Sequence, residues 1–208
     1  MQHDQARASE REPRYVEGVA SVYDHRVTLH DVTWEQYEAL LDVRGDRAGV
    51  RMAYLQGELE LMSPSRSHEG IKTLLGRLLE AYAEERGLDL NGFGSWTLKS
   101  RAKERGVEPD ECYELGGGPK EFPDLAIEVV WTSGGLDKLE IYRAFGVREV
   151  WIWRDSRIEV HALRGEQYER IPRSELLPEI DLGQLARLAE SDNQTQAVRD
   201  FRKALLGG

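Results

Sequence analysis

The stretch "FPDLAIEVVWTSGGLDKLEIYRAFGVREVWIW", residues 122–153, decides the fold, because it predicts a strand, a helix and a second strand in turn. One face of the first strand is apolar, with Leu125, Ile127, Val129 and Trp131. The other face carries two acids, in the set Asp124, Ala126 and Glu128. Burying a charge is costly unless something compensates it. We therefore expect that face to be wet, or to meet a cation or a basic group.

The segments before this unit extend the sheet and add a helix. Residues 68–87 carry a strong apolar stripe with helical spacing, with Ser67 as the expected N-cap and Gly87 as the stop. Strands are expected within residues 93–100 and 106–115. The middle of the chain therefore reads helix, strand, strand, strand, helix, strand. This order predicts an α/β (α+β) fold with a central mixed β-sheet flanked by helices.

The chain of 208 residues is long enough for one substantial domain. Residues 1–14 are polar, and we expect them to be disordered. We expect a single domain over residues 15–190, followed by a C-terminal helix over residues 191–208. There is no internal repeat and no low-complexity linker, so the organisation predicted from the sequence is one domain with short appendages.

Composition limits the compartment and the partners. Hydrophobic residues make up 40% and charged residues 32%, which is ordinary for a soluble globular protein. No run approaches the roughly 18 apolar residues that a membrane helix needs, and the polar start of the chain does not resemble a signal peptide. The single cysteine, Cys112, cannot form an internal disulfide and suits a reducing compartment. We expect a cytoplasmic protein with no membrane partner.

The formal net charge is −10. General nucleic-acid-coating proteins usually show a basic footprint, so this charge argues against that class. It does not exclude a nuclease, because carboxylates that hold metal ions add negative charge and a local basic patch can still bind phosphate.

Two acids on neighbouring segments predict a metal site. If residues 106–115 and the strand from residue 122 form a hairpin that turns near residues 118–119, Asp110 lies opposite residues 126–128. Asp110 and Glu128 are then side by side, with Cβ atoms roughly 4.5–5.5 Å apart. Two carboxylates at that distance repel unless a cation lies between them. A divalent metal ion with oxygen ligands resolves the conflict.

Two nearby residues, Asp124 and Lys138, are weighed against this pair. Asp124 lies four residues before Glu128, roughly 13 Å along the strand, so we expect a supporting role in which it caps the strand start or binds a group behind the metal ligands. Lys138 precedes the core-facing Ile141 by three residues and should point toward the sheet. There it could position a water molecule or stabilise charge on a phosphate, whereas an isolated helical lysine is usually solvated.

The start of the expected helix at residue 68 supplies two more supporting candidates. Glu69 could point toward the metal ion, and His68 could contact phosphate or act as an acid or base. The alternative for both is the ordinary chemistry of a helix N-terminus, where an acid favours the macrodipole. Glu58 and Glu60 lie on a strand that could flank the cleft, but we expect them to be exposed charges on a strand edge. Cys112 is expected to pack rather than react.

These residues, in this order of elements, resemble the PD-(D/E)XK nuclease superfamily. More closely, the chain resembles the Uma-two family of restriction-endonuclease-like proteins. The matching segments are "YLQGELELMSPSRSHE", "GVEPDECYEL", "FPDLAIEVVWTSGGLDKLEIYRAFGVREVWIW" and "IEVHALRGEQY", which cover roughly residues 50–170.

The resemblance implies a central mixed sheet and a carboxylate-bound Mg²⁺ or Mn²⁺. It assigns Asp110 to the "PD" position and Glu128 to the "(D/E)" position, with both as metal ligands. One departure is visible, because Val130 stands where the superfamily has its lysine. In the Uma-two pattern the lysine lies in the following helix, which here is Lys138.

Two classes of function remain open. The first is a Mg²⁺-dependent endonuclease that hydrolyses phosphodiester bonds of DNA, with Asp110, Glu128 and Lys138 as its catalytic residues. RNA is a further possible substrate of the same fold. The second is a non-catalytic nuclease-like protein that binds a partner or dimerises, which the acidic net charge favours. A homodimer is expected on general grounds, since dimers are common among oligomers.

Overall fold

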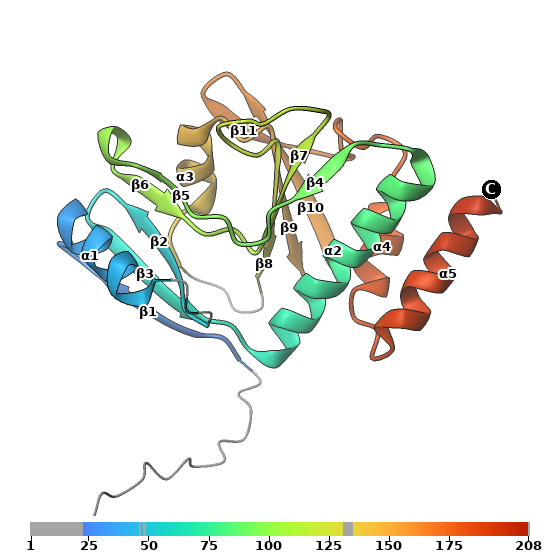
Figure 1. Cartoon of the computed structure of the whole chain (residues 1–208), viewed down its shortest axis with the longest axis horizontal. Coiled ribbons are helices and arrows are strands. Elements are labelled where there is room, and N and C mark those ends of the chain that lie inside the picture. Colours follow the sequence, from blue (N-terminus) through green and yellow to red (C-terminus); the bar gives the residue numbers. More distant parts are fainter. Residues whose placement is uncertain (1–22, 46, 48, 131–134, 208) are drawn as a thin grey trace, which may run out of the picture.

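The computed structural model describes residues 23–45, 47, 49–130 and 135–207 (Figure 1). The segment 1–14 and Trp131 therefore lie outside the described residues. The strands are β1 His25–Leu29, β2 Arg51–Leu55, β3 Glu58–Ser63, β4 Leu90–Gly92, β5 Leu98–Ser100, β6 Arg105–Val107, β7 Glu111–Leu115, β8 Leu125–Val129, β9 Glu149–Arg154, β10 Arg157–Arg164 and β11 Gln167–Ile171. The helices are α1 Trp34–Arg44, α2 Arg66–Arg86, α3 Lys138–Phe145, α4 Leu182–Leu188 and α5 Gln194–Leu206, with a 3₁₀ turn at Arg101–Lys103.

The strands form two sheets, which confirms the α+β class. The first, here called the N-terminal sheet, has the order β1-β3-β2-β6-β5 and is antiparallel. The second, here called the central sheet, has the order β11-β10-β9-β8-β7-β4. It is mixed, because β8 and β9 run parallel while the other neighbours are antiparallel. The segment 122–153 thus forms the parallel unit β8-α3-β9 in the middle of this sheet.

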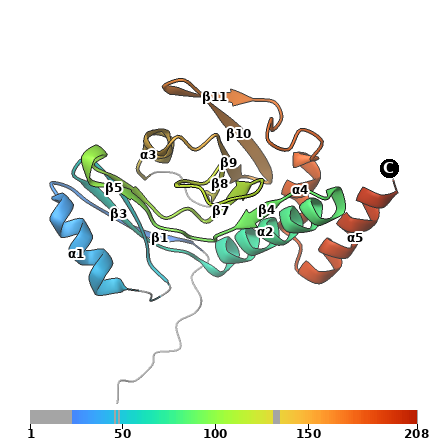
Figure 2. The same cartoon turned by 45° about the horizontal axis from the view of Figure 1, so that its top comes forward.

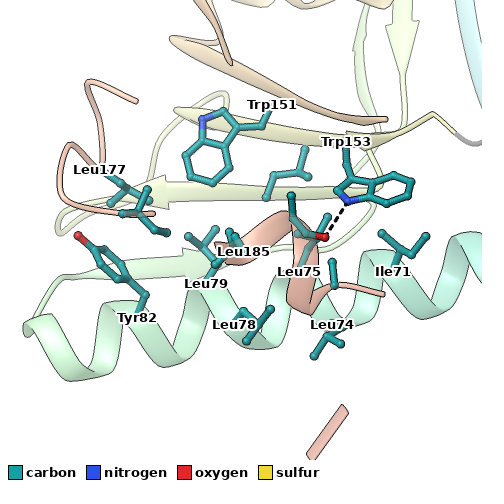
Figure 3. Packing of buried hydrophobic residues seen from close by; sticks show 14 of the residues in the cluster. Ile71, Leu74, Leu75, Leu78, Leu79, Tyr82, Trp151, Trp153, Leu177 and Leu185 are labelled. Carbon is teal, nitrogen blue, oxygen red and sulfur yellow. Dashed lines mark hydrogen bonds between the residues drawn. The ribbon is translucent and has the colours of Figure 1, made fainter. Parts of the chain in front are cut away.

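One face of the central sheet is closed by helices. Apolar side chains of α2, α4 and α5 pack with those of β7 to β10 in one core cluster. Figure 3 shows Trp151 and Trp153 of β9 above the leucines of α2, and the Trp153 Nε1–H group donates to the Ala186 carbonyl at 3.4 Å. Both indoles are almost fully buried. Trp151 and Trp153 lie two residues apart and so share the face of β9 that packs in the core.

The other face of the central sheet meets α3, which lies on the opposite side from α2 (Figure 2). A second core cluster joins α3 to Ala126 and Val150 of the central sheet and to Ala53 and Val107 of the N-terminal sheet. Helix α3 is therefore wedged between the two sheets. The acidic face of β8 is turned toward this junction, since Ala126 shares that face with Glu128.

The chain passes from one sheet to the other at Glu108–Pro109–Asp110, between β6 and β7. Beyond this bend, β7 pairs with β8 so that Glu111 lies opposite Ile127 and Cys112 opposite Ala126. Asp110 stands just before β7, and its side chain meets β8 at the Val129 N–H, one residue past Glu128.

Helix α2 begins earlier than predicted. The structure starts the helix at Arg66 and caps it with Ser65, whose hydroxyl accepts the His68 N–H at 3.2 Å. The expected cap, Ser67, is wrong because it lies inside the first turn. The shift matters for the site, since it makes His68 a helical residue whose side chain is completely buried.

Candidate active site

Glu128 lies near the end of β8 with only 2% of its surface exposed. Lys138 Nζ lies 2.5 Å from Glu128 Oε2, and the Tyr142 hydroxyl donates a hydrogen bond to Oε1. Lys138 and Tyr142 are four residues apart on α3, so one helix face presents both groups to the carboxylate. Burial, and then the charge of Glu128, raises the pKa of Tyr142 well above its ordinary value. Tyr142 therefore stays protonated and fixes the orientation of Glu128.

Asp110 lies at the bend beside Glu128 and is fully buried. Its Oδ2 accepts the Val129 N–H at 2.7 Å, so the side chain takes the place of a ladder hydrogen bond at the end of β8. Its Oδ1 lies against the Arg51 guanidinium and 3.0 Å from His68 Nε2. Each of the two acids therefore has its own basic partners.

The contacts of Asp110 continue outward through two basic residues. Arg51 Nη2 donates to Glu69 Oε1 at 2.6 Å, and His68 Nδ1 lies 2.9 Å from Asp24 Oδ2. Burial alone would raise the pKa of Asp24, but hydrogen bonds from His68 and the Ser65 backbone outweigh it and hold that pKa below its usual range. The structure thus brings His68 into direct contact with Asp110 and brings Glu69 to it through one arginine.

Asp124 does not join this group. Its Oδ2 accepts the Leu115 N–H at 2.7 Å and lies 2.5 Å from Lys120 Nζ, while Arg148 approaches its Oδ1 at 3.5 Å. Burial works to raise the pKa of Asp124, but the Lys120 and Leu115 hydrogen bonds prevail and lower it. Asp124 closes the β7–β8 hairpin at the far end of β8, as its spacing from Glu128 suggested.

A pocket of about 190 Å³ opens between the two sheets beside Glu128. We call it the inter-sheet pocket. Its charged lining residues are Arg26, Glu60, Glu128, Asp137, Lys138 and Arg154. The pocket gives solvent and small groups a route to Glu128 and Lys138, which the burial of Glu128 alone would not suggest.

Glu60 lines the same pocket, and the expectation that it is an exposed edge charge is wrong. It is 2% exposed, lies 3.3 Å from Arg26 Nε, and accepts the Leu136 N–H at 3.1 Å. The reason is that β1 pairs along the outer side of β3, so β3 is not an edge strand. Glu60 therefore holds the start of α3 against the N-terminal sheet. Glu58, in contrast, is partly exposed and contacts His30.

Cys112 packs, as expected. It is fully buried, its thiol donates to the Gly94 carbonyl at 3.3 Å, and burial raises its pKa to about 12. A thiol with that pKa supplies almost no thiolate near neutral pH, so it is a poor nucleophile.

The comparison with known families now bears on this geometry. The model of the Uma2 family, described as "Putative restriction endonuclease", matches residues 34–189, which is most of the chain. This chain belongs to the Uma2 family. The matched range contains Asp110, Glu128 and Lys138, together with His68 and Glu69. A comparison with curated proteins finds no match.

Membership of the Uma2 family supports a nuclease-like function and a nucleic acid as the class of substrate. It agrees with the α+β architecture, in which the β8-α3-β9 unit carries Glu128 and Lys138. Within the described part of the chain, no helix is both long enough and apolar enough to cross a bilayer.

The carboxylates of Asp110 and Glu128 match an open divalent-metal site, in which water completes the metal shell. They do not match a closed site built only from protein ligands. Across residues 23–45, 47, 49–130 and 135–207, no three His, Cys, Asp or Glu side chains converge into a closed ligand cluster. Mg²⁺, however, is usually held by one or two carboxylates, with water and substrate phosphates completing its shell. Asp110 and Glu128 match that number of carboxylates, and in this structure Asp110 Oδ1 is held by Arg51 and His68. The pair therefore fits an open site for a hard cation in a Uma2 protein.

Sequence reasoning missed Arg51, Asp24 and the role of Tyr142. Tyr142 could have been found, because it lies four residues after Lys138 on the same helix face. No spacing or motif in the sequence indicated that Arg51 or Asp24 belongs to the site. They reach Asp110 and His68 only because β2 and the segment before β1 lie across the bend from α2, which depends on how the two sheets pack.

Proposed function

We propose that the protein is a divalent-metal-dependent endonuclease that hydrolyses phosphodiester bonds of DNA. Asp110 and Glu128 would be its metal ligands, and Lys138 the basic group beside them. The observation that carries the proposal is the approach of Lys138 Nζ to 2.5 Å from Glu128 Oε2, next to Asp110, in a chain of the Uma2 family. Lys138 and the two carboxylates therefore lie on neighbouring elements. The lysine is on α3 and not on β8, which carries Glu128.

A bound Mg²⁺ or Mn²⁺ would supply charge stabilisation at the phosphate and a water molecule of lowered pKa. Side chains of the protein would orient the carboxylates and stabilise charge on the substrate. Tyr142, held protonated, donates to Glu128 Oε1 and fixes that carboxylate. Lys138 keeps a positive charge at Glu128 Oε2. On the wall of the inter-sheet pocket it can stabilise charge that develops on a phosphate oxygen.

Asp110 would be held in place by the chain around it. The Val129 N–H fixes one of its carboxylate oxygens, and His68 and Arg51 flank the other. The Val129 N–H contact is preorganised and costs no rearrangement at the moment of reaction. Cation binding at Oδ1 would compete with Arg51, so we expect that guanidinium to turn away when the site is loaded.

The function is tested by incubating the wild type with DNA and RNA of the same sequence in Mg²⁺, in Mn²⁺ and in EDTA. We expect cleavage of DNA that requires the metal ion. In parallel, Lys138→Gln removes the positive charge but keeps a hydrogen-bond donor, and kcat should fall by roughly 10²–10³. Lys138→Arg should recover part of that loss.

The outcomes separate the two functions left open. A wild type that cleaves neither nucleic acid in either metal contradicts the nuclease and favours the non-catalytic, partner-binding protein. Cleavage by Lys138→Gln at the wild-type rate would leave the nuclease standing but remove Lys138 from its site. A purely structural lysine would change the melting temperature of the Gln variant without changing kcat.

A further inference from the structure

A second depression, about 600 Å³ in volume, lies on the side of Asp110 that faces Arg51. It is formed by the end of α1 and the segment after it, the start of β2, the end of β3 and the first turns of α2, with residues 95, 97 and 108 on the far side. Its basic lining residues are Arg44, Arg47, Arg51 and Lys72, and its acidic ones are Glu69 and Glu108. We call it the basic pocket, because it has an excess of positive charge on a chain whose net charge is −10.

One of the two acids in the basic pocket is already neutralised. Glu108 is 3% exposed and binds Arg44 through contacts of 2.5 and 2.6 Å. It also accepts hydrogen bonds from the Met52 N–H at 2.9 Å and from the Thr97 hydroxyl at 2.8 Å. Arg44 and Glu108 therefore form a closed structural pair, and they contribute no net charge to a ligand.

The remaining basic residues, Arg47, Arg51 and Lys72, lie near three acids, which are Glu69, Asp110 and Glu111. Arg51 contacts Glu69 and Asp110. Lys72 Nζ donates to Glu69 Oε2 at 3.3 Å and lies 3.6 Å from Glu111 Oε1. The Arg47 side chain is exposed and forms no ion pair within the described residues. Arg47 has no acid partner there, and the two contacts of Lys72 are longer than those of Arg51, so Arg47 and Lys72 are the charges that we expect to contact an outside anion.

The basic pocket adjoins the candidate site through a single side chain. Arg51 lines the pocket and also lies against Asp110 Oδ1. Asp110 is in turn the neighbour of Glu128, which lines the inter-sheet pocket. A polyanion lying in the basic pocket would therefore be separated from the buried Asp110 carboxylate by one side chain, Arg51, and the hydroxyls of Ser63 and Ser95 in its walls could also bind phosphate oxygens.

We propose that the basic pocket binds backbone phosphates of the nucleic-acid strand whose scissile bond enters the acid pair, with Arg47 and Lys72 as its phosphate contacts. This inference rests on the proposed function for the class of substrate, but it concerns binding rather than cleavage. Phosphate contacts position a nucleic acid and are sensitive to salt. An acidic protein with a small number of such contacts should bind DNA weakly and with a shallow salt dependence.

The test is binding of a fluorescently labelled DNA duplex by the full chain in EDTA, measured as anisotropy over a series of salt concentrations. Each phosphate contact contributes about 0.9 to the slope of log K against log salt for duplex DNA. Arg47→Gln and Lys72→Gln should each flatten the slope by about that amount and weaken binding roughly five- to tenfold near 0.1 M salt. The double variant should lose about the product of the two effects.

Matched controls are available on α5, which packs against α2 away from the basic pocket (Figure 1). Arg199→Gln and Lys203→Gln remove the same charges from exposed positions. They should leave both the slope and the affinity within about twofold of the wild type, because they remove no phosphate contact. Thermal melting of all five variants checks that each is folded.

Wild-type slope and affinity in the double variant would overturn the inference, and so would an equal loss in the α5 controls. A wild type that binds inorganic phosphate in calorimetry but not the duplex would assign the pocket to a free anion and also overturn it. These failures are separate from failure of the proposed function. A wild type that binds the duplex in EDTA but does not cleave it in Mg²⁺ would contradict the proposed function and leave this inference standing, and cleavage in Mg²⁺ can persist in variants that bind more weakly.

Discussion

Glu128→Gln should lower metal-dependent DNA cleavage by at least about 10³-fold, the largest effect on activity that we expect. A metal ion stabilises the charge that develops on a phosphate by several kcal/mol, and each 1.36 kcal/mol is a factor of ten in rate. Glutamine keeps the size of the side chain and one acceptor oxygen, but it has no charge with which to hold the ion. The loss should appear in kcat at saturating DNA.

The structure lets this effect be separated from loss of folding. In Glu128→Gln the amide can still accept from Tyr142 or Lys138, although an uncompensated lysine charge would remain. Glu121→Gln is the matched control, because Glu121 is an exposed glutamate seven positions before Glu128 in the chain. We expect it to cleave at the wild-type rate. Equal cleavage by the wild type, Glu128→Gln and Asp110→Asn would contradict the assignment of the site to these two acids.

Trp153→Ala should give the largest loss of stability, because it opens the centre of the core beneath the site. Trp153 is 1% exposed, packs against α2 and α4, and donates to the Ala186 carbonyl (Figure 3). Removing a buried tryptophan costs about 3–5 kcal/mol. For a chain of this length that should lower the melting temperature by roughly 6–20 °C, measurable by circular dichroism.

Trp96→Ala is the comparison for this prediction. Trp96 is only partly buried, beside Phe93, at a ring-centroid distance of 5.5 Å. Its removal should therefore cost less than that of Trp153. A drop in melting temperature that is equal for the two variants, or negligible for Trp153→Ala, would contradict the assignment of β9 to the centre of the core.

Local pattern was enough to predict the elements that carry Glu128 and Lys138. The alternation in β8 separates apolar from acidic residues, and three glycines mark the turn between β7 and β8. The spacing of core residues on α3 turns Lys138 toward the sheet. Periodicity of this kind depends only on neighbours in one or two adjacent elements, which is why it can be read from a single sequence.

Features that depend on the packing of the two sheets could not be predicted in this way. Arg51 meets Asp110 only after β2 packs across the bend that leads into the central sheet, and Glu60 meets Arg26 only after β1 pairs along β3. The burial of His68 between Asp24 and Asp110 needs the same arrangement. None of these partners has a characteristic spacing in the sequence, so sequence analysis predicted the two acids and the lysine but not the basic residues around Asp110.

The central claim is that Asp110 and Glu128 hold one divalent cation site, and calorimetric titration with Mn²⁺ tests it most directly. The wild type should bind at least one ion, and Glu128→Gln and Asp110→Asn should each lose that binding while Glu121→Gln retains it. Absence of Mn²⁺ binding by the folded wild type, or binding that survives in both acid variants, would contradict the claim.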